Sequence, residues 1–88
     1  MISFTEFVVS LASTAAIHLG DLADPESGEQ IEPHLQGAQQ MIDVLSLLEV
    51  KTRGNLTAQE RQVLEQVLGE LRMRLVEVER GGPPLVVP

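Results

Sequence analysis

The sequence contains no cysteine, tryptophan or tyrosine, and Phe4 and Phe7 are its only aromatic residues. Without cysteine the chain can form neither a disulfide framework nor a thiolate metal site, which favours a reducing compartment. Without more aromatic rings it lacks the stacking surfaces on which single-stranded nucleic acid is commonly held. We therefore predict a cytoplasmic protein whose core is mostly aliphatic.

Basic residues are also scarce: six Lys and Arg stand against thirteen Asp and Glu, for a net charge of −7. This charge repels phosphate backbones, so we expect no nucleic-acid partner. No stretch approaches the roughly 18 consecutive apolar residues of a membrane span. Glu6 interrupts the apolar start, and no Lys or Arg precedes it, so we predict neither a membrane span nor a signal peptide.

The first predicted helix covers about residues 4–19. Ser3 and Glu6 have the spacing of a capping box, and Gly20 is suited to end the helix. At 100° per residue the apolar residues form one wide face, which a single neighbouring helix cannot cover. That face contains Phe4, Phe7, Val8, Val9, Leu11, Ala12, Ala15, Ala16 and Leu19.

The acidic segment from Asp21 to Pro33 contains Pro25 and Gly28, which predicts a mobile connection. A second helix is expected over about 33–53, with Pro33 in its first turn. Its apolar stripe consists of Leu35, Ala38, Met41, Ile42, Leu45 and Leu48, whereas Val44, Leu47 and Val50 lie off the stripe.

A tight corner should connect this helix to a third, over about 58–80. Gly54 provides a left-handed position after the second helix, and Thr57 with Glu60 forms another capping box. Spacings of four and three then repeat in a seam of Leu64, Leu68, Leu71, Leu75 and Val78. We predict an all-α single domain over 1–80, three helices with an antiparallel hairpin, and a flexible Pro-rich tail over 81–88.

A chain of 88 residues leaves much of its surface outside any core that it can build alone. The surplus apolar faces of the first two helices therefore predict completion by oligomerisation. We expect a homo-oligomer, most simply a two-fold dimer, and leave open a further, unidentified protein partner.

The string from Ile42 to Glu60, IDVLSLLEVKTRGNLTAQE, resembles the central motif of the bacterial domain of unknown function 1844 family. Positions Asp43, Lys51-Thr52, Gly54 to Thr57 and Glu60 match that motif. The N-terminal pattern is similar as well, and the resemblance spans most of residues 3–76. It implies a small, cytoplasmic helical protein, and no catalytic residue is carried over from it.

Two groups of residues are candidates for a site. At the corner, Lys51, Arg53 and the first N–H groups of the third helix could hold a small anion, with Asn55 beside them, but the pattern favours the structural alternative, in which Thr57 caps those groups. On the second helix, Asp43 lies close in projection to Leu47 and Val50. These three residues form either an interface, where Asp43 pairs with a basic group, or a solvated face.

His18 and His34 are the only imidazoles, and a catalytic or metal site would require them to meet carboxylates such as Asp21 or Glu32. We predict no catalytic residue, metal or cofactor. The leading hypothesis is a non-enzymatic oligomerisation or protein-interaction module. The alternatives are a carrier whose cavity is lined by Met41 and the alanine-rich first helix, and an enzyme with an unrecognised site.

Overall fold

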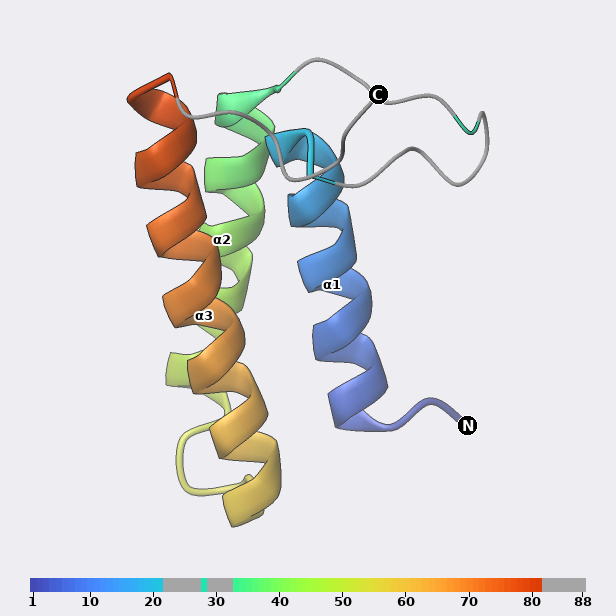
Figure 1. Ribbon diagram of the computed structural model, residues 1–88. Coiled ribbons are helices and arrows are strands. Elements are labelled where there is room, and N and C mark those ends of the chain that lie inside the picture. The colour runs from blue at the N-terminus through green and yellow to red at the C-terminus, as the bar shows by residue number, and fades with distance from the viewer. Residues whose placement is uncertain (22–27, 29–32, 82–88) are drawn as a thin grey trace.

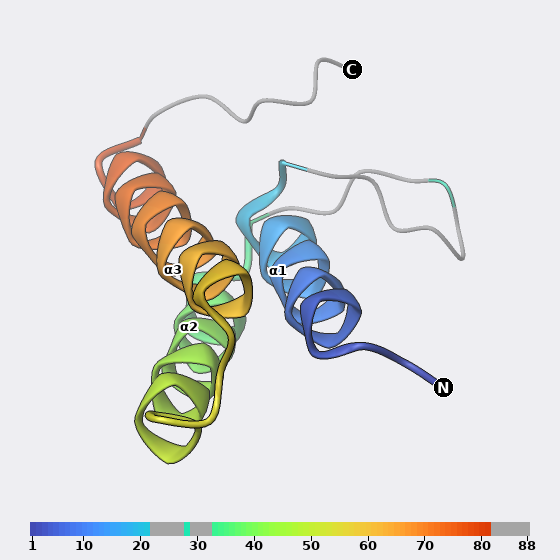
Figure 2. The ribbon, with the colours of Figure 1, turned by 90° about the horizontal axis from the view of Figure 1, so that it is seen from below.

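A computed structural model describes residues 1–21, 28 and 33–81, which contain three helices. They are α1 (Phe4–Leu19), α2 (Leu35–Lys51) and α3 (Ala58–Glu79). α1 and α3 run in one direction and α2 in the other (Figure 1), and the end view shows the helices around a common centre (Figure 2). Each pair of helices is in contact, which confirms the predicted all-α fold with an antiparallel α2–α3 hairpin. The tail over 82–88 and most of the predicted connection lie outside the described residues.

The helix ends follow local hydrogen bonding. The Ser3 hydroxyl accepts from the N–H of Glu6 at 3.0 Å, and α1 ends where Gly20 takes a left-handed φ of 83°. At α3, the Thr57 hydroxyl accepts from the Glu60 N–H while the Glu60 carboxylate accepts from the Thr57 N–H, which confirms the predicted capping box.

α2 is shorter than the predicted 33–53. The prediction that Pro33 lies in its first turn is wrong, because His34 is the N-cap with a non-helical φ of −117° and ψ of 84°. The N–H of His34 donates to the carbonyl oxygen of His18 at 2.6 Å, so this residue is bonded to the end of α1. At the other end α2 stops at Lys51, and Gly54 turns the chain with a φ of 87°.

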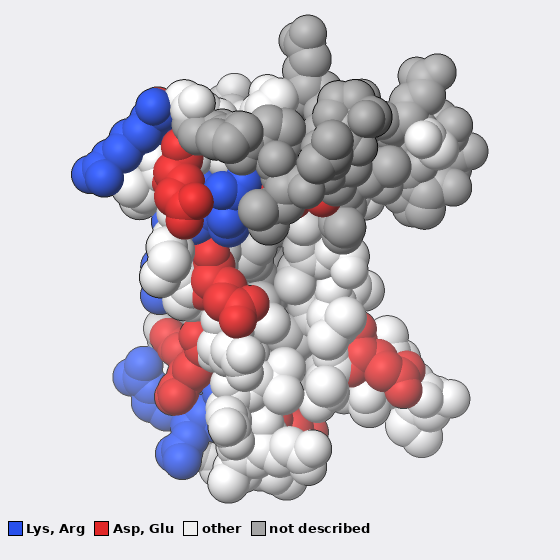
Figure 3. All heavy atoms as spheres, viewed as in Figure 1, with Lys and Arg blue, Asp and Glu red and all other residues white. Residues whose placement is uncertain are grey.

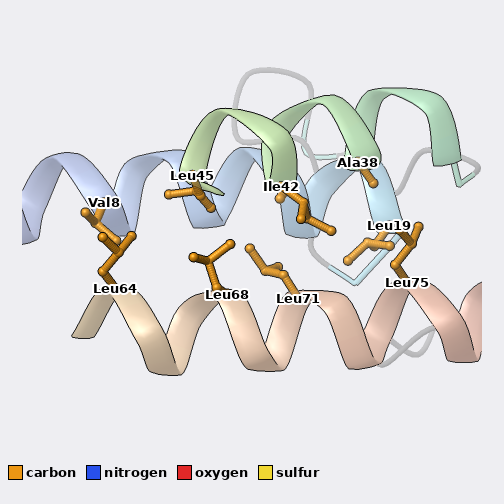
Figure 4. Packing of buried hydrophobic residues seen from close by; sticks show 10 residues of the cluster. Val8, Leu19, Ala38, Ile42, Leu45, Leu64, Leu68, Leu71 and Leu75 are labelled. Atoms are coloured by element: carbon orange, nitrogen blue, oxygen red, sulfur yellow. The ribbon is translucent and has the colours of Figure 1, made fainter. Parts of the chain in front are cut away.

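The core consists of aliphatic side chains from all three helices (Figure 4). The seam of α3 points inward, as its spacing predicts, and meets side chains of α1 and α2. Its four leucines are buried, whereas Val78 is half-buried. The buried apolar residues are Val8, Ala15, Leu19, Ala38, Ile42, Leu45, Leu64, Leu68, Leu71 and Leu75.

A buried ion pair joins the end of α1 to α3. Two Arg74 nitrogens donate to the two carboxylate oxygens of Asp21, at 2.6 and 2.9 Å, and the Asp21 side chain is only 7% exposed. The hydrogen bond to Asp21 raises the pKa of Arg74 further above its ordinary value. The prediction that Asp21 belongs to a mobile connection is therefore wrong, because a bidentate charged contact holds it.

Candidate interaction surface

The outer side of the α2–α3 hairpin exposes large apolar side chains. On α2, Leu47 and Val50 are each 57% exposed, as expected for residues off the apolar stripe. On α3, Met73 is 65% exposed and Val76 44% exposed. Single exposed apolar residues are ordinary, but several on one face mark an interaction surface.

A contact between the two helices, together with helical spacing, relates these residues: Leu47 is three positions from Val50, and Met73 is three positions from Val76. The Arg72 guanidinium donates to the Ser46 hydroxyl at 2.7 Å, so these two positions lie side by side. Residues three and four apart on a helix are surface neighbours, so Val50 lies next to Ser46 and Val76 next to Arg72. Gly69 neighbours Arg72 on the other side. We call Asp43, Leu47, Val50, Gly69, Arg72, Met73 and Val76 the hairpin face.

Gly69 is an unusual residue for the middle of a helix. Glycine in a helix interior costs about 1 kcal/mol relative to alanine. A Cβ atom built at Gly69 would meet no atom within 4 Å, so packing within the described residues does not require glycine there. A small residue on an exposed helix surface would, however, let another helix approach closely.

The charged groups of the hairpin face lack opposite-charge partners among the described residues. Within the described ranges, the Asp43 carboxylate accepts only from the Gln39 amide, at 2.9 Å, and Asp43 is exposed. The ion pairs of residues 1–21, 28 and 33–81 all involve Arg74, so neither Asp43 nor Arg72 takes part in one. The predicted pairing of Asp43 with a basic group would therefore have to be supplied by another molecule.

At the hairpin corner the structure groups different residues from those predicted. A cleft of about 310 Å³ is lined by Arg53 and Arg61, together with Glu49, Gly54, Leu56, Leu64 and Glu65. Lys51 and Asn55 are exposed and do not line this cleft. Thr57 binds the N–H of Glu60, so this donor is already satisfied. Because two arginines face two glutamates, the cleft does not have the positive charge that favours a small anion, and an anion site remains a prediction.

The two histidines meet where α1 ends and α2 begins. Their ring centroids are 5.4 Å apart in an edge-to-face arrangement, and the buried Nδ1 of His18 has no hydrogen-bond partner among the described residues. Asp21 is bound to Arg74, and Glu32 lies outside the described residues. Within the described part of the chain, no three His, Asp or Glu side chains are grouped for metal binding. The two imidazoles therefore lie at the contact between the end of α1 and the start of α2.

Gly37 explains how α2 approaches these rings. A Cβ atom at Gly37 would lie 2.8 Å from Nδ1 of His34 and 3.0 Å from Nδ1 of His18. Gly37→Gln should therefore lower the free energy of unfolding by about 1–3 kcal/mol through overpacking. Gly69→Gln is the matched control and should raise it by about 0.5–1 kcal/mol at concentrations where the chain is monomeric. Urea unfolding followed by circular dichroism measures both; stabilisation by both substitutions would contradict the close contact at Gly37.

The groove between α1 and α3 is mostly apolar. A hollow of about 260 Å³ opens there, lined by Val9, Ala12, Ser13, Ala16, Val67, Glu70 and Leu71. Glu6 is the only Asp, Glu, Lys or Arg within α1, and Figure 3 shows white atoms over most of this helix. Met41, which the carrier hypothesis places at a cavity within the bundle, packs against the core and is not among the residues that line this hollow.

The family model described as "Domain of unknown function (DUF1844)" matches residues 1–77. The chain belongs to the DUF1844 family. This confirms the resemblance seen in the sequence, and the match extends over α1, α2 and most of α3 of the DUF1844 domain. No curated protein and no solved structure matches the chain. Among the described residues of this DUF1844 protein, none of the helices has the length and apolar character needed to cross a membrane.

Sequence reasoning found the α2 half of the hairpin face and missed the α3 half. Met73 and Val76 are apolar residues off the leucine seam, the same signal that singled out Leu47 and Val50 on α2. Arg72 could not be placed from sequence, because its contact with Ser46 joins residues that are 26 positions apart.

Proposed function

We propose that this DUF1844 protein is a non-enzymatic module that associates through the hairpin face, first of all with a second copy of itself. The observation that carries the proposal is the exposure of Leu47, Val50, Met73 and Val76 on one side of the hairpin. Removing apolar surface from water stabilises association by roughly 25 cal/mol per Å² before the entropic cost of binding.

The size and charge of the domain support the same proposal. Ten apolar residues form the buried core among the described residues, and small domains with limited cores commonly gain stability from a partner chain. The net charge of −7 keeps copies apart in general, so association needs a face where local contacts outweigh that repulsion. The hairpin face has both apolar surface and groups of both signs.

Met73→Glu tests the proposal. A carboxylate on the apolar surface would have to be desolvated in the interface, so the dissociation constant of the oligomer should rise at least about tenfold, equivalent to 1.4 kcal/mol. The matched control is Val9→Glu, at a 49% exposed residue of the α1–α3 groove, which should leave association nearly unchanged. Sedimentation with interference optics suits a chain without Trp or Tyr. Equal weakening by both variants would place the interface elsewhere.

The apolar hollow between α1 and α3 favours a second candidate function, carriage of a small apolar ligand. The hollow lies at the surface, and alanines line its α1 side. Native mass spectrometry of protein purified gently from its own cells would detect such a ligand as an added mass. Loss of that mass in Ala12→Glu, with the helical content unchanged, would support carriage, whereas its retention would remove the hollow as the binding site.

A further inference from the structure

We infer that two copies pair through the hairpin face in a two-fold dimer, in which Asp43 of each copy forms an ion pair with Arg72 of the partner subunit. This inference rests on the proposed function and specifies the partner and its register. It starts from two charges of opposite sign on the same apolar face, one on α2 and the other on α3, that form no ion pair with each other or with any other described residue.

The register follows from the Ser46–Arg72 contact. Ser46 is the residue of α2 beside Arg72, so Asp43, three residues before Ser46, lies about one helical turn from the level of Arg72, within the reach of an extended arginine side chain. A two-fold axis that runs roughly along the helices, on the outer side of the hairpin, places Asp43 of each copy beside α3 of the other copy, about one turn from Arg72. α2 then packs against α3 of the second copy, and the dimer is a four-helix arrangement with antiparallel neighbours.

The same axis accounts for the other residues of the hairpin face. Leu47, Val50, Met73 and Val76, which are exposed in the single chain, become buried against the second copy in this arrangement. Gly69, where open space surrounds the position of a Cβ atom, gives the neighbouring backbone room to approach. In a symmetric interface each Asp43–Arg72 contact occurs twice, so its loss or reversal has a doubled effect on association.

The charges of the hairpin face also explain why a second copy of the chain is a suitable partner for this face. Two chains with a net charge of −7 repel each other, so a face that carries only carboxylates would oppose self-association. The hairpin face has one carboxylate and one guanidinium. A two-fold rotation therefore brings the carboxylate of each copy toward the guanidinium of the other copy. Arginine also forms planar, two-point contacts with carboxylates, which adds geometric specificity.

A charge-exchange experiment tests the pair. Asp43→Arg and Arg72→Asp, each made alone, should raise the dimer dissociation constant at least about tenfold, because each places like charges opposite one another twice. The double variant Asp43→Arg/Arg72→Asp restores both pairs and should return within about threefold of the wild type. Sedimentation equilibrium with interference optics measures all four proteins, and circular dichroism of each checks that the helices are intact.

The sign of the Asp43→Arg effect separates local pairing from long-range charge. Exchanging a −1 group for a +1 group changes the net charge per chain from −7 to −5, which by itself favours association. Glu6→Arg, outside the hairpin face, makes the same change in net charge and should leave association equal or slightly tighter. Weakening by Asp43→Arg alone is therefore evidence for the local pair.

The outcomes distinguish a failure of self-association from a failure of the Asp43–Arg72 pair alone. A wild-type protein that is monomeric at all concentrations overturns both self-association and the pair. A wild-type dimer that Met73→Glu weakens, but whose double charge variant is as weak as the single variants, retains the proposed interface and overturns the Asp43–Arg72 register.

Discussion

Replacing Leu68 by alanine should lower the free energy of unfolding by about 3–4 kcal/mol. Leu68 is 1% exposed and projects from the middle of α3 into the core beside Leu45 (Figure 4). Truncation removes buried methyl groups and leaves a cavity that neighbouring side chains fill only in part, and both effects destabilise the fold. Domains of this size are stable by about 5–10 kcal/mol, so the variant loses a large fraction of its stability.

Urea unfolding at a fixed subunit concentration is the appropriate measurement, because any self-association adds to the apparent stability. Gln62→Ala on the exposed side of the same helix is the control and should change the free energy of unfolding by less than about 0.5 kcal/mol. A Leu68→Ala variant as stable as the control would contradict the placement of the leucine seam in the core.

Replacing Arg74 by alanine should have a similarly large effect, about 3 kcal/mol. The substitution leaves the Asp21 carboxylate buried without the guanidinium that binds both of its oxygens. An uncompensated buried charge is much more costly than the loss of an exposed ion pair. A fall in melting temperature of more than about 10 °C is expected, since 1 kcal/mol corresponds to roughly 4–8 °C in a domain of this length.

Glu77 provides the control for this ion pair. It also accepts from Arg74, at 2.9 Å, but its side chain is 51% exposed. Glu77→Ala should therefore cost at most about 0.5 kcal/mol, as exposed pairs of neighbouring helix residues do. Equal effects of Arg74→Ala and Glu77→Ala in thermal unfolding would show that Asp21 is not held in a buried pair.

The helices were predictable because their signals are local. Capping residues, left-handed glycines and the spacing of the α3 leucines act within a few residues of one another. The start of α2 and the ion pair at the end of α1 were not predictable from local signals. The bond from His34 to the His18 carbonyl and the pairing of Asp21 with Arg74 both depend on how distant segments pack. The latter joins residues 53 positions apart, so no local pattern reveals it.

In the hairpin face, too, some residues could be selected from local periodicity and others could not. Leu47, Val50 and Asp43 could be selected from the periodicity of α2, because exposed apolar positions are visible on a single helix. Their neighbours Gly69, Arg72 and Met73 required the register of the hairpin, which the Arg72–Ser46 hydrogen bond supplies. At the corner, Arg61 of α3, and not the predicted Lys51, lines the cleft together with Arg53, which depends on how α3 packs against the end of α2.

Sedimentation equilibrium of the wild-type protein over about a thousandfold range of concentration tests the central claim most directly. Association through the hairpin face predicts a mass that rises from one to two chain masses, with Met73→Glu shifting the transition to higher concentration and Val9→Glu leaving it in place. A single chain mass at every concentration would contradict the account.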